Sequence, residues 1–319
     1  MVKWRKGHIL ILIFVIAYFF GNMVFLEKFP FVHSDETWLG GLSRFILQTG
    51  KLDETEPFFD LYKRSPHALR LIFQGIQMLF IKIFGYSVST LRSISLLFTC
   101  GSLYLVYRLM LVLEYSEIHA VLTSMILAAG VQFIYAGHFA RQESIILFLH
   151  ILSLYLFFKT VDAKKRKYDF FTGFSISAAV SVHPNSFVIF LPLVFLYLYR
   201  ILVCKDKDFR NLLFFLIPVI CSAGLFLAIS FLFDPSFIRN YFSYGSTLGV
   251  DNSLPVKIQG VYDYFYKLFF QISGTYYTPF IQVELVVLCL IGVAGIGFCI
   301  ASCVSAKASP KGKKTTNGQ

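Results

Sequence analysis

Two adjacent carboxylates, Asp35 and Glu36, follow shortly after an apolar segment at 8–26. Carboxylates in such a position could hold a divalent cation or take a proton from a hydroxyl group. Apolar residues from Trp38 to Leu47 recur at helical spacing, which predicts a short helix lying on a membrane surface with Asp35 at its N-terminal end. The same pair would equally serve as an ordinary helix cap, so the local pattern supports both interpretations.

Two further groups could bind a phosphate or support a site. The cations Lys63 and Arg64 suit a lipid phosphate, although they could also anchor an interfacial helix. Arg141 and Glu143 lie where one apolar segment ends and the next begins, and a structural salt bridge is the simpler interpretation of that pair. A lone histidine, His183, stands at a helix break before a proline and is typical of a hydrogen-bonded structural residue.

Composition places these residues in a membrane protein. The chain has 319 residues, of which 56% are apolar and 15% are charged, too apolar for a soluble domain. Its net charge of +11 comes from Lys and Arg at the ends of apolar segments, a distribution that indicates membrane topology and not nucleic-acid binding. The six cysteines show no ligand spacing and predict neither a zinc site nor a disulfide framework.

The apolar segments predict an all-α, polytopic transmembrane bundle of about eight to nine spans, since a crossing helix needs roughly 20 apolar residues. Residues 68–84 form an amphipathic segment, which favours an interfacial helix in the first outer loop over a ninth span. The eight clear spans are 8–26, 91–113, 117–137, 142–160, 169–182, 185–203, 211–233 and 284–304.

The positive-inside rule orients this bundle. If 68–84 does not cross, the run Lys164–Lys167 and a short basic tail at 305–319 are cytoplasmic, as is the N-terminus. The loops 27–90 and 234–283 are then outside, together with all the candidate site residues. The second of these loops is rich in tyrosine, which indicates an interfacial aromatic belt or a lid over a sugar. We treat 1–304 as one membrane domain.

The order of short motifs resembles the C-type membrane glycosyltransferases, in particular the group with protein O-mannosyltransferases and aminoarabinose transferases. The likeness covers roughly 8–205. The motifs are Asp35-Glu36, Tyr62-Lys63-Arg64-Ser65-Pro66, Phe84-Gly85-Tyr86-Ser87, Leu91-Arg92, Ala140-Arg141-Gln142-Glu143 and Val182-His183-Pro184.

The resemblance implies transfer of a monosaccharide, usually with inversion, from a polyprenyl-phosphate donor to a lipid, glycan or protein acceptor on the outer face. Asp35 would deprotonate or orient the acceptor, and Glu36 would assist it or bind the acceptor. Lys63 and Arg64 would neutralise the leaving phosphate, with Arg141 as a further contact. Fixed cations stabilise such developing charge effectively.

The resemblance leaves several expectations open. Some relatives use a divalent cation such as Mg or Mn, for which Asp35 is the candidate ligand here. His138, Glu143 and His183 are candidates for acceptor contact or support. The chain departs from the usual pattern at Ser65, His138 and Glu143, where relatives commonly have proline, arginine and aspartate, and its C-terminal part is shorter.

The sequence is consistent with two functions. The first is a glycosyltransferase in a bacterial inner membrane. The second is a non-catalytic transporter or flippase of lipid-linked sugars, or a scaffold for cell-envelope glycan assembly. An ion-coupled transporter is disfavoured because ionisable residues are scarce in the middle of the predicted spans. Membrane lipids are expected partners in either case.

Overall fold

The computed structural model describes most of the chain, and all its regular elements there are α-helices. Two compact units, residues 1–252 and 253–319, are described separately below. The described residues are 6–51, 70–163, 165–183, 186, 189–202, 209–240, 253–270 and 281–308.

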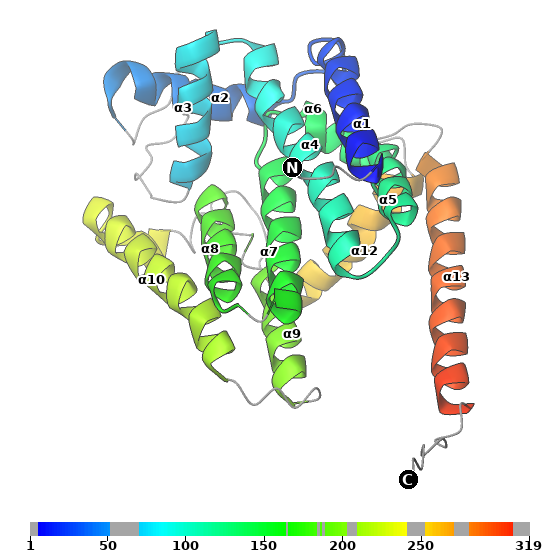
Figure 1. Ribbon diagram of the computed structural model, residues 1–319. Helices are drawn as coiled ribbons and strands as arrows, with labels where there is room; N and C mark the ends of the chain where they lie inside the picture. Colours follow the sequence, from blue (N-terminus) through cyan, green and yellow to red (C-terminus); the bar gives the residue numbers. More distant parts are fainter. Residues whose placement is uncertain are drawn as a thin grey trace, which may run out of the picture. The chain divides into compact units, whose positions relative to one another are not determined.

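The first unit is a bundle of helices (Figure 1). Its α1, α4, α7 and α10 are each long and apolar enough to cross a membrane. The shorter α3 and α9 are apolar as well. The helices are α1 Lys6–Met23, α2 Ser34–Thr49, α3 Leu71–Phe84, α4 Val88–Val112, α5 Glu117–Ala128, α6 Val131–His138, α7 Glu143–Ala163, α8 Lys167–Val182, α9 Phe190–Leu202 and α10 Phe209–Phe233.

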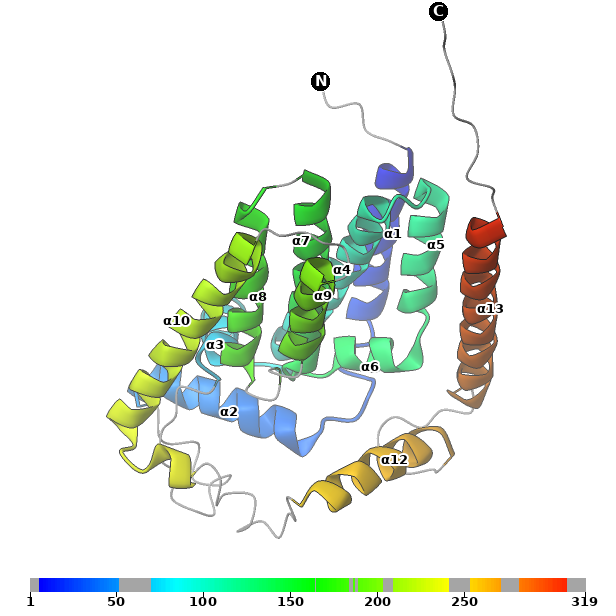
Figure 2. The ribbon, with the colours of Figure 1, turned by 90° about the horizontal axis from the view of Figure 1, so that it is seen from below.

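The segment expected as one span at 117–137 is instead a bent pair. Its two parts, α5 and α6, meet at a 68° bend where Ala129 ends one helix and Gly130 caps the next. As a result α6 lies crosswise at one end of the bundle (Figure 2). The bend places residues 138–141 next to the beginning of α7.

The bundle has two ends, and which of them faces the cytoplasm stays a prediction from the positive-inside rule. At one end the Gly7 amide donates to Glu117 Oε2 at 2.8 Å, joining the beginnings of α1 and α5. The beginning of α8 lies at this end too, whereas α2 lies across the opposite end (Figure 2). We call the latter the α2 end. At 14 residues, α3 would extend only ~21 Å, which is short for a span, so its interfacial placement stays a prediction.

Several predicted element boundaries match closely. The helix expected after Asp35 is α2, which ends at Gly50 in the left-handed conformation that glycine adopts readily. His183 ends α8 with extended backbone, as expected for a residue before proline. Five helices in the described ranges qualify as spans, or six with the bent pair counted, so eight to nine spans stays a prediction.

Helices α8 and α10 cross at very short distance. Gly173 in α8 lies directly against the backbone of Phe215, so a Cβ at this position would collide with the Phe215 carbonyl oxygen. Near the crossing, the Ser177 hydroxyl donates to the Pro218 carbonyl at 3.0 Å. Close approach of this kind is typical of small residues between membrane helices.

Replacing Gly173 with Ala is expected to destabilise the protein by about 1–3 kcal/mol, because a backbone atom cannot rotate away and the helices must separate. Thermal unfolding in detergent measures the effect. Gly75→Ala is the matched control, since a Cβ there meets nothing within 4 Å and alanine favours the helix. Equal unfolding temperatures for Gly173→Ala and the wild type would contradict the close crossing.

The second unit contains α12 Leu254–Phe270 and α13 Ile281–Ala308, and α13 is long and apolar enough to be a span. On α12, the rings of Tyr262 and Tyr266 stack with centroids 6.2 Å apart. Much of the predicted tyrosine-rich loop, including Tyr241, Tyr244, Tyr276 and Tyr277, lies outside the described residues. The choice between belt and lid therefore stays open.

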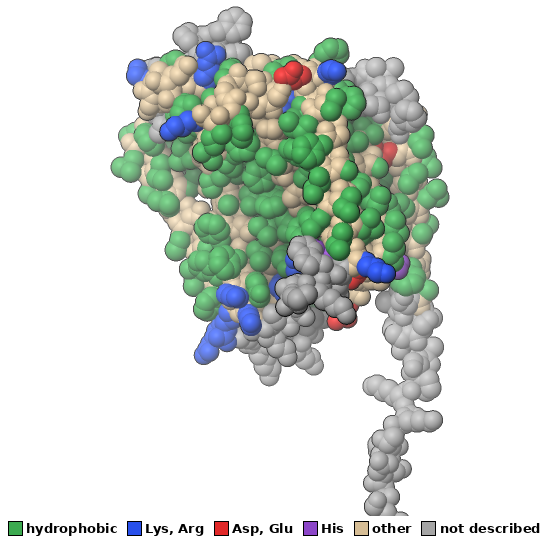
Figure 3. Space-filling model, turned by 45° about the horizontal axis from the view of Figure 1, so that its top comes forward, with side chains coloured by type: hydrophobic (Ala, Val, Ile, Leu, Met, Phe, Trp, Pro, Cys, Tyr) green, Lys and Arg blue, Asp and Glu red, His purple; other side chains and the backbone are tan. Residues whose placement is uncertain are grey.

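The surface is that of an integral membrane protein. Hydrophobic side chains cover a broad band of the molecule, while Lys, Arg, Asp and Glu gather toward its edges (Figure 3). Large side chains such as Phe195, Leu232 and Leu213 are well exposed on this surface. An apolar exterior of this extent requires a lipid environment.

Candidate active site

The site is built around the N-terminus of α2. His33 precedes the helix in extended conformation, and its Nδ1 accepts a hydrogen bond from the Asp35 amide at 3.1 Å. The Glu36 carboxylate in turn accepts from the His33 amide at 2.9 Å. His33 therefore caps the helix, and the Asp35 carboxylate, 45% exposed, has its Oδ2 3.9 Å from His33 Nδ1.

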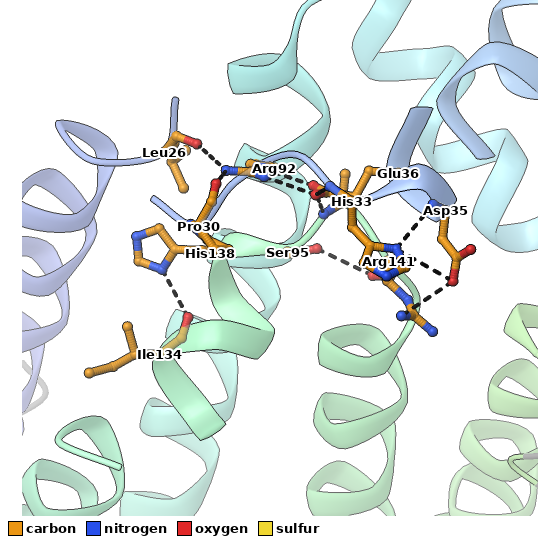
Figure 4. A network of polar contacts seen from close by, with 11 residues as sticks. Leu26, Pro30, His33, Asp35, Glu36, Arg92, Ser95, Ile134, His138 and Arg141 are labelled. Carbon is orange, nitrogen blue, oxygen red and sulfur yellow. Dashed lines mark hydrogen bonds and ion pairs between the residues drawn. The ribbon is translucent and has the colours of Figure 1, made fainter. Parts of the chain in front are cut away.

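Glu36 forms a buried ion pair with Arg92 of α4. Arg92 Nε and Nη2 donate to Oε2 and Oε1, both at 2.8 Å, and the two side chains are 0% and 3% exposed (Figure 4). The Ala140 amide adds a third hydrogen bond, to Oε2 at 2.8 Å. Together with the bond from His33, both carboxylate oxygens are occupied. Bidentate geometry of this kind, with further hydrogen bonds, offsets the free-energy cost of removing two charges from water.

Arg92 also binds the loop that joins α1 to α2. Its Nη1 donates to the carbonyl oxygens of Leu26 at 2.6 Å and Pro30 at 2.9 Å. One buried pair thus ties α2, α4, this loop and the residue before Arg141 together. No partner for Arg92 was predicted from the sequence. A signal for one was present, because an arginine in an apolar span pairs with an acidic side chain or with backbone carbonyl groups.

Asp35 belongs to a different, more open pair. Its Oδ2 lies 3.3 Å from Arg141 Nη1 (Figure 4). Arg141 Nη2 lies 2.8 Å from Glu143 Oε1. The Arg141 side chain is 25% exposed. Arg141 does form the expected salt bridge with Glu143, and it also reaches Asp35. The chain thus places a carboxylate and a guanidinium side by side at the α2 end, partly open to the surroundings.

Two more basic or ionisable side chains adjoin this pair. Arg70, just before α3, stacks its guanidinium over the Trp38 ring at 5.2 Å. Burial, together with the positive charges of Arg70 and Arg141, lowers the pKa of His183 to about 4. His183 is therefore neutral at pH 7. From the sequence, Arg70 was considered only as part of the amphipathic segment at 68–84.

An apolar cluster beneath the site holds these residues in place. Each of its members lies within three residues of a charged or ionisable residue described above. Their helices differ, so the cluster brings five separate stretches of sequence together. The members are Leu39 of α2, Phe73 of α3, Ile94 of α4, Ile145 of α7 and Val182 of α8.

Not all predicted residues reach this arrangement. His138 is 1% exposed, and its Nδ1 contacts the Ile134 carbonyl at 2.8 Å, away from Asp35 (Figure 4). Lys63 and Arg64 lie outside the described residues. Among the residues that are described, no group of three or more His, Cys, Asp and Glu could hold a metal ion, and Asp35 stays a predicted ligand only.

The helical membrane bundle with a crosswise, acidic helix at one end has the fold of C-type membrane glycosyltransferases. The crystal structure of ArnT from Cupriavidus metallidurans, solved bound to undecaprenyl phosphate, is similar with a TM-score of 0.57 at 15% sequence identity. The match covers 73% of this chain and 43% of that chain, so the protein spans less than half the length of this relative.

Residues 68–237 match the dolichyl-phosphate-mannose-protein mannosyltransferase family, and this region is more than half of the sequence. The chain belongs to this family. The matched region includes Arg70, Arg92, Arg141 and His183, whereas Asp35 precedes it. No curated protein sequence matches the chain.

Proposed function

We propose that this protein transfers a monosaccharide from a polyprenyl-phosphate donor to an acceptor hydroxyl or amine of a lipid, glycan or protein. The observation that carries the proposal is the pair of Asp35 and Arg141, 3.3 Å apart at the α2 end of a bundle of this family. We assign that end to the outer face of a bacterial inner membrane, with both termini in the cytoplasm, on the positive-inside rule.

The pair suits an inverting displacement. The acceptor oxygen or nitrogen would attack the anomeric carbon while Asp35 takes its proton, and the bond from that carbon to the phosphate oxygen would break. The electron pair leaves with polyprenyl phosphate, whose charge Arg141 would stabilise. Asp35 Oδ1 has no hydrogen-bond partner among the described residues, which leaves it able to accept a proton.

The two adjacent carboxylates would then have different roles. Both oxygens of Glu36 are occupied by Arg92, Ala140 and His33, so we propose a positioning role in place of the acceptor contact expected from the resemblance. Lys63 and Arg64 keep their proposed role at the phosphate from the resemblance alone. A divalent cation at Asp35 would have to displace or share Oδ2 with Arg141.

An apolar groove between α8 and α10 fits the prenyl chain of such a donor. It has a volume of about 360 Å³ and is lined by Phe174, Ser181, Pro218 and Leu225 among others. Ile72, two residues after Arg70, lines the same groove. The groove therefore begins beside the charged site and continues along helices that face lipid, where a prenyl chain would replace membrane lipid.

Reconstitution in proteoliposomes tests the function. Radiolabelled polyprenyl-phosphate sugars of defined sugar type would be supplied with a membrane extract as acceptor source. A transferase releases polyprenyl phosphate and moves the label to the acceptor. A flippase would instead move the intact donor across the bilayer without cleaving it, and that result would replace the proposal with the transporter alternative.

A further inference from the structure

We propose that Arg70 is a further phosphate-binding residue, which holds the phosphate of a prenyl-phosphate donor together with Arg141, next to His183. The inference rests on the function proposed above and names a residue that the motif resemblance does not include. Its class of ligand is a phosphate mono- or diester carrying a prenyl chain.

The apolar cluster places Arg70 at the site. Phe73, three residues after Arg70, packs in the same cluster as Val182, the residue before His183. Ile145, two residues after Glu143, is a member too. Because these three side chains share one cluster, the ends of the helices that carry Arg70, His183 and Arg141 must lie close to one another.

Stacking on Trp38 fixes the orientation of the Arg70 guanidinium. The contact is 5.2 Å from ring centroid to the central carbon, and Trp38 is three residues from Asp35 on α2. The N–H groups of a guanidinium lie in its plane, where they can bind phosphate oxygens bidentately. Stacking also reduces the rotamer freedom that binding would otherwise remove.

The electrostatics around His183 indicate an anion between the two arginines. Burial is the main cause of the lowered pKa of His183, and the charges of Arg70 and Arg141, which come from two different elements, add to it. The nearby acids, Asp35 and Glu143, are both paired with Arg141. Arg141 Nε is nevertheless buried with no hydrogen-bond partner in the described part of the chain, although a buried donor normally has one. A phosphate oxygen would supply it.

Arg70 is also separated by only one residue from the lining of the apolar groove. Ile72 lines the groove that continues between α8 and α10. A phosphate held by Arg70 would therefore place an attached prenyl chain at the beginning of that groove. Charge recognition at Arg70 and apolar contact beyond Ile72 together match the two ends of a prenyl phosphate.

Binding of farnesyl phosphate and of farnesol to the full-length protein in detergent tests the inference. Arg70→Gln is expected to raise the Kd for farnesyl phosphate by about 10-fold or more, the loss of a hydrogen-bonded charge contact. Arg70→Lys should be intermediate, and farnesol binding should be unchanged. Arg44→Gln is the matched control, because Arg44 also stacks on an aromatic ring, Tyr86 at 4.9 Å.

A second readout follows the His183 imidazole by NMR. Farnesyl phosphate is expected to raise the pKa of His183 in the wild type, because a bound anion favours the protonated ring. The rise should be smaller in Arg70→Gln. Unchanged affinity and an unchanged His183 response in Arg70→Gln would overturn the role of Arg70, even if Arg141→Gln binds poorly. A wild type that binds farnesyl phosphate no better than farnesol would count against the proposed function itself.

Discussion

Replacing Asp35 with Asn is expected to lower kcat for sugar transfer by about 10²–10⁴-fold, the usual contribution of a positioned general base. In the wild type, Asp35 Oδ2 lies 3.3 Å from Arg141 Nη1. The side-chain amide oxygen of Asn can take the place of this carboxylate oxygen, so the local structure should persist. What is lost is the capacity to take a proton from the acceptor. Donor binding should change far less than kcat.

Initial rates of label transfer in proteoliposomes measure this effect, with unfolding temperature as a check on the fold. Glu27→Gln is the matched control, since Glu27 is an exposed carboxylate outside the site whose partner is Ser89. It should transfer at the wild-type rate. If the transfer rate of Asp35→Asn is within a few-fold of the wild-type rate, Asp35 is not the general base. The proposed catalytic pair of Asp35 and Arg141 would then be wrong.

Breaking the buried pair should instead destabilise the protein. Glu36→Gln or Arg92→Met alone is expected to cost about 3–5 kcal/mol, because each leaves the other charge buried and unpaired. The Ala140 amide and the loop carbonyls that Arg92 binds would be disturbed too. Loss of activity in these variants would therefore follow loss of structure.

Thermal unfolding in detergent, with the double variant Glu36→Leu/Arg92→Met, isolates the charge effect. The double variant should be more stable than either single variant, since no uncompensated charge is left. Glu143→Gln is the control, because its exposed pair with Arg141 should contribute less than about 1 kcal/mol. Single variants as stable as Glu143→Gln would show that the Glu36–Arg92 pair does not hold the loop.

These expectations separate two residues that are neighbours in sequence. Consecutive positions on a helix differ by about 100° in direction. At the N-terminus of α2 this turns Glu36 toward the interior and leaves Asp35 half-exposed. Adjacent carboxylates that look equivalent in the sequence thus become one positioning residue and one candidate base.

Much of the fold was accessible from the sequence because the membrane imposes a simple rule. Backbone groups in lipid must be satisfied within helices, so apolar length predicts the helices α1, α4, α7, α10 and α13. Lys and Arg at segment ends then predict that Arg141 and Asp35 share one end of the bundle. The break between α5 and α6 was not predicted, because a glycine in an apolar run does not by itself indicate a 68° bend.

The sequence alone determined the class of protein, the helical bundle and the set of ionisable residues near its outer loops, since hydrophobic length and charge asymmetry are local properties. Only the tertiary structure decided how those residues pair. The partners of Glu36 and Asp35, Arg92 and Arg141, are 56 and 106 residues away, and helix packing, not sequence spacing, sets which of them meet. One apolar cluster holds together the helix ends that carry these charged residues. Its members are Leu39, Phe73, Ile94, Ile145 and Val182.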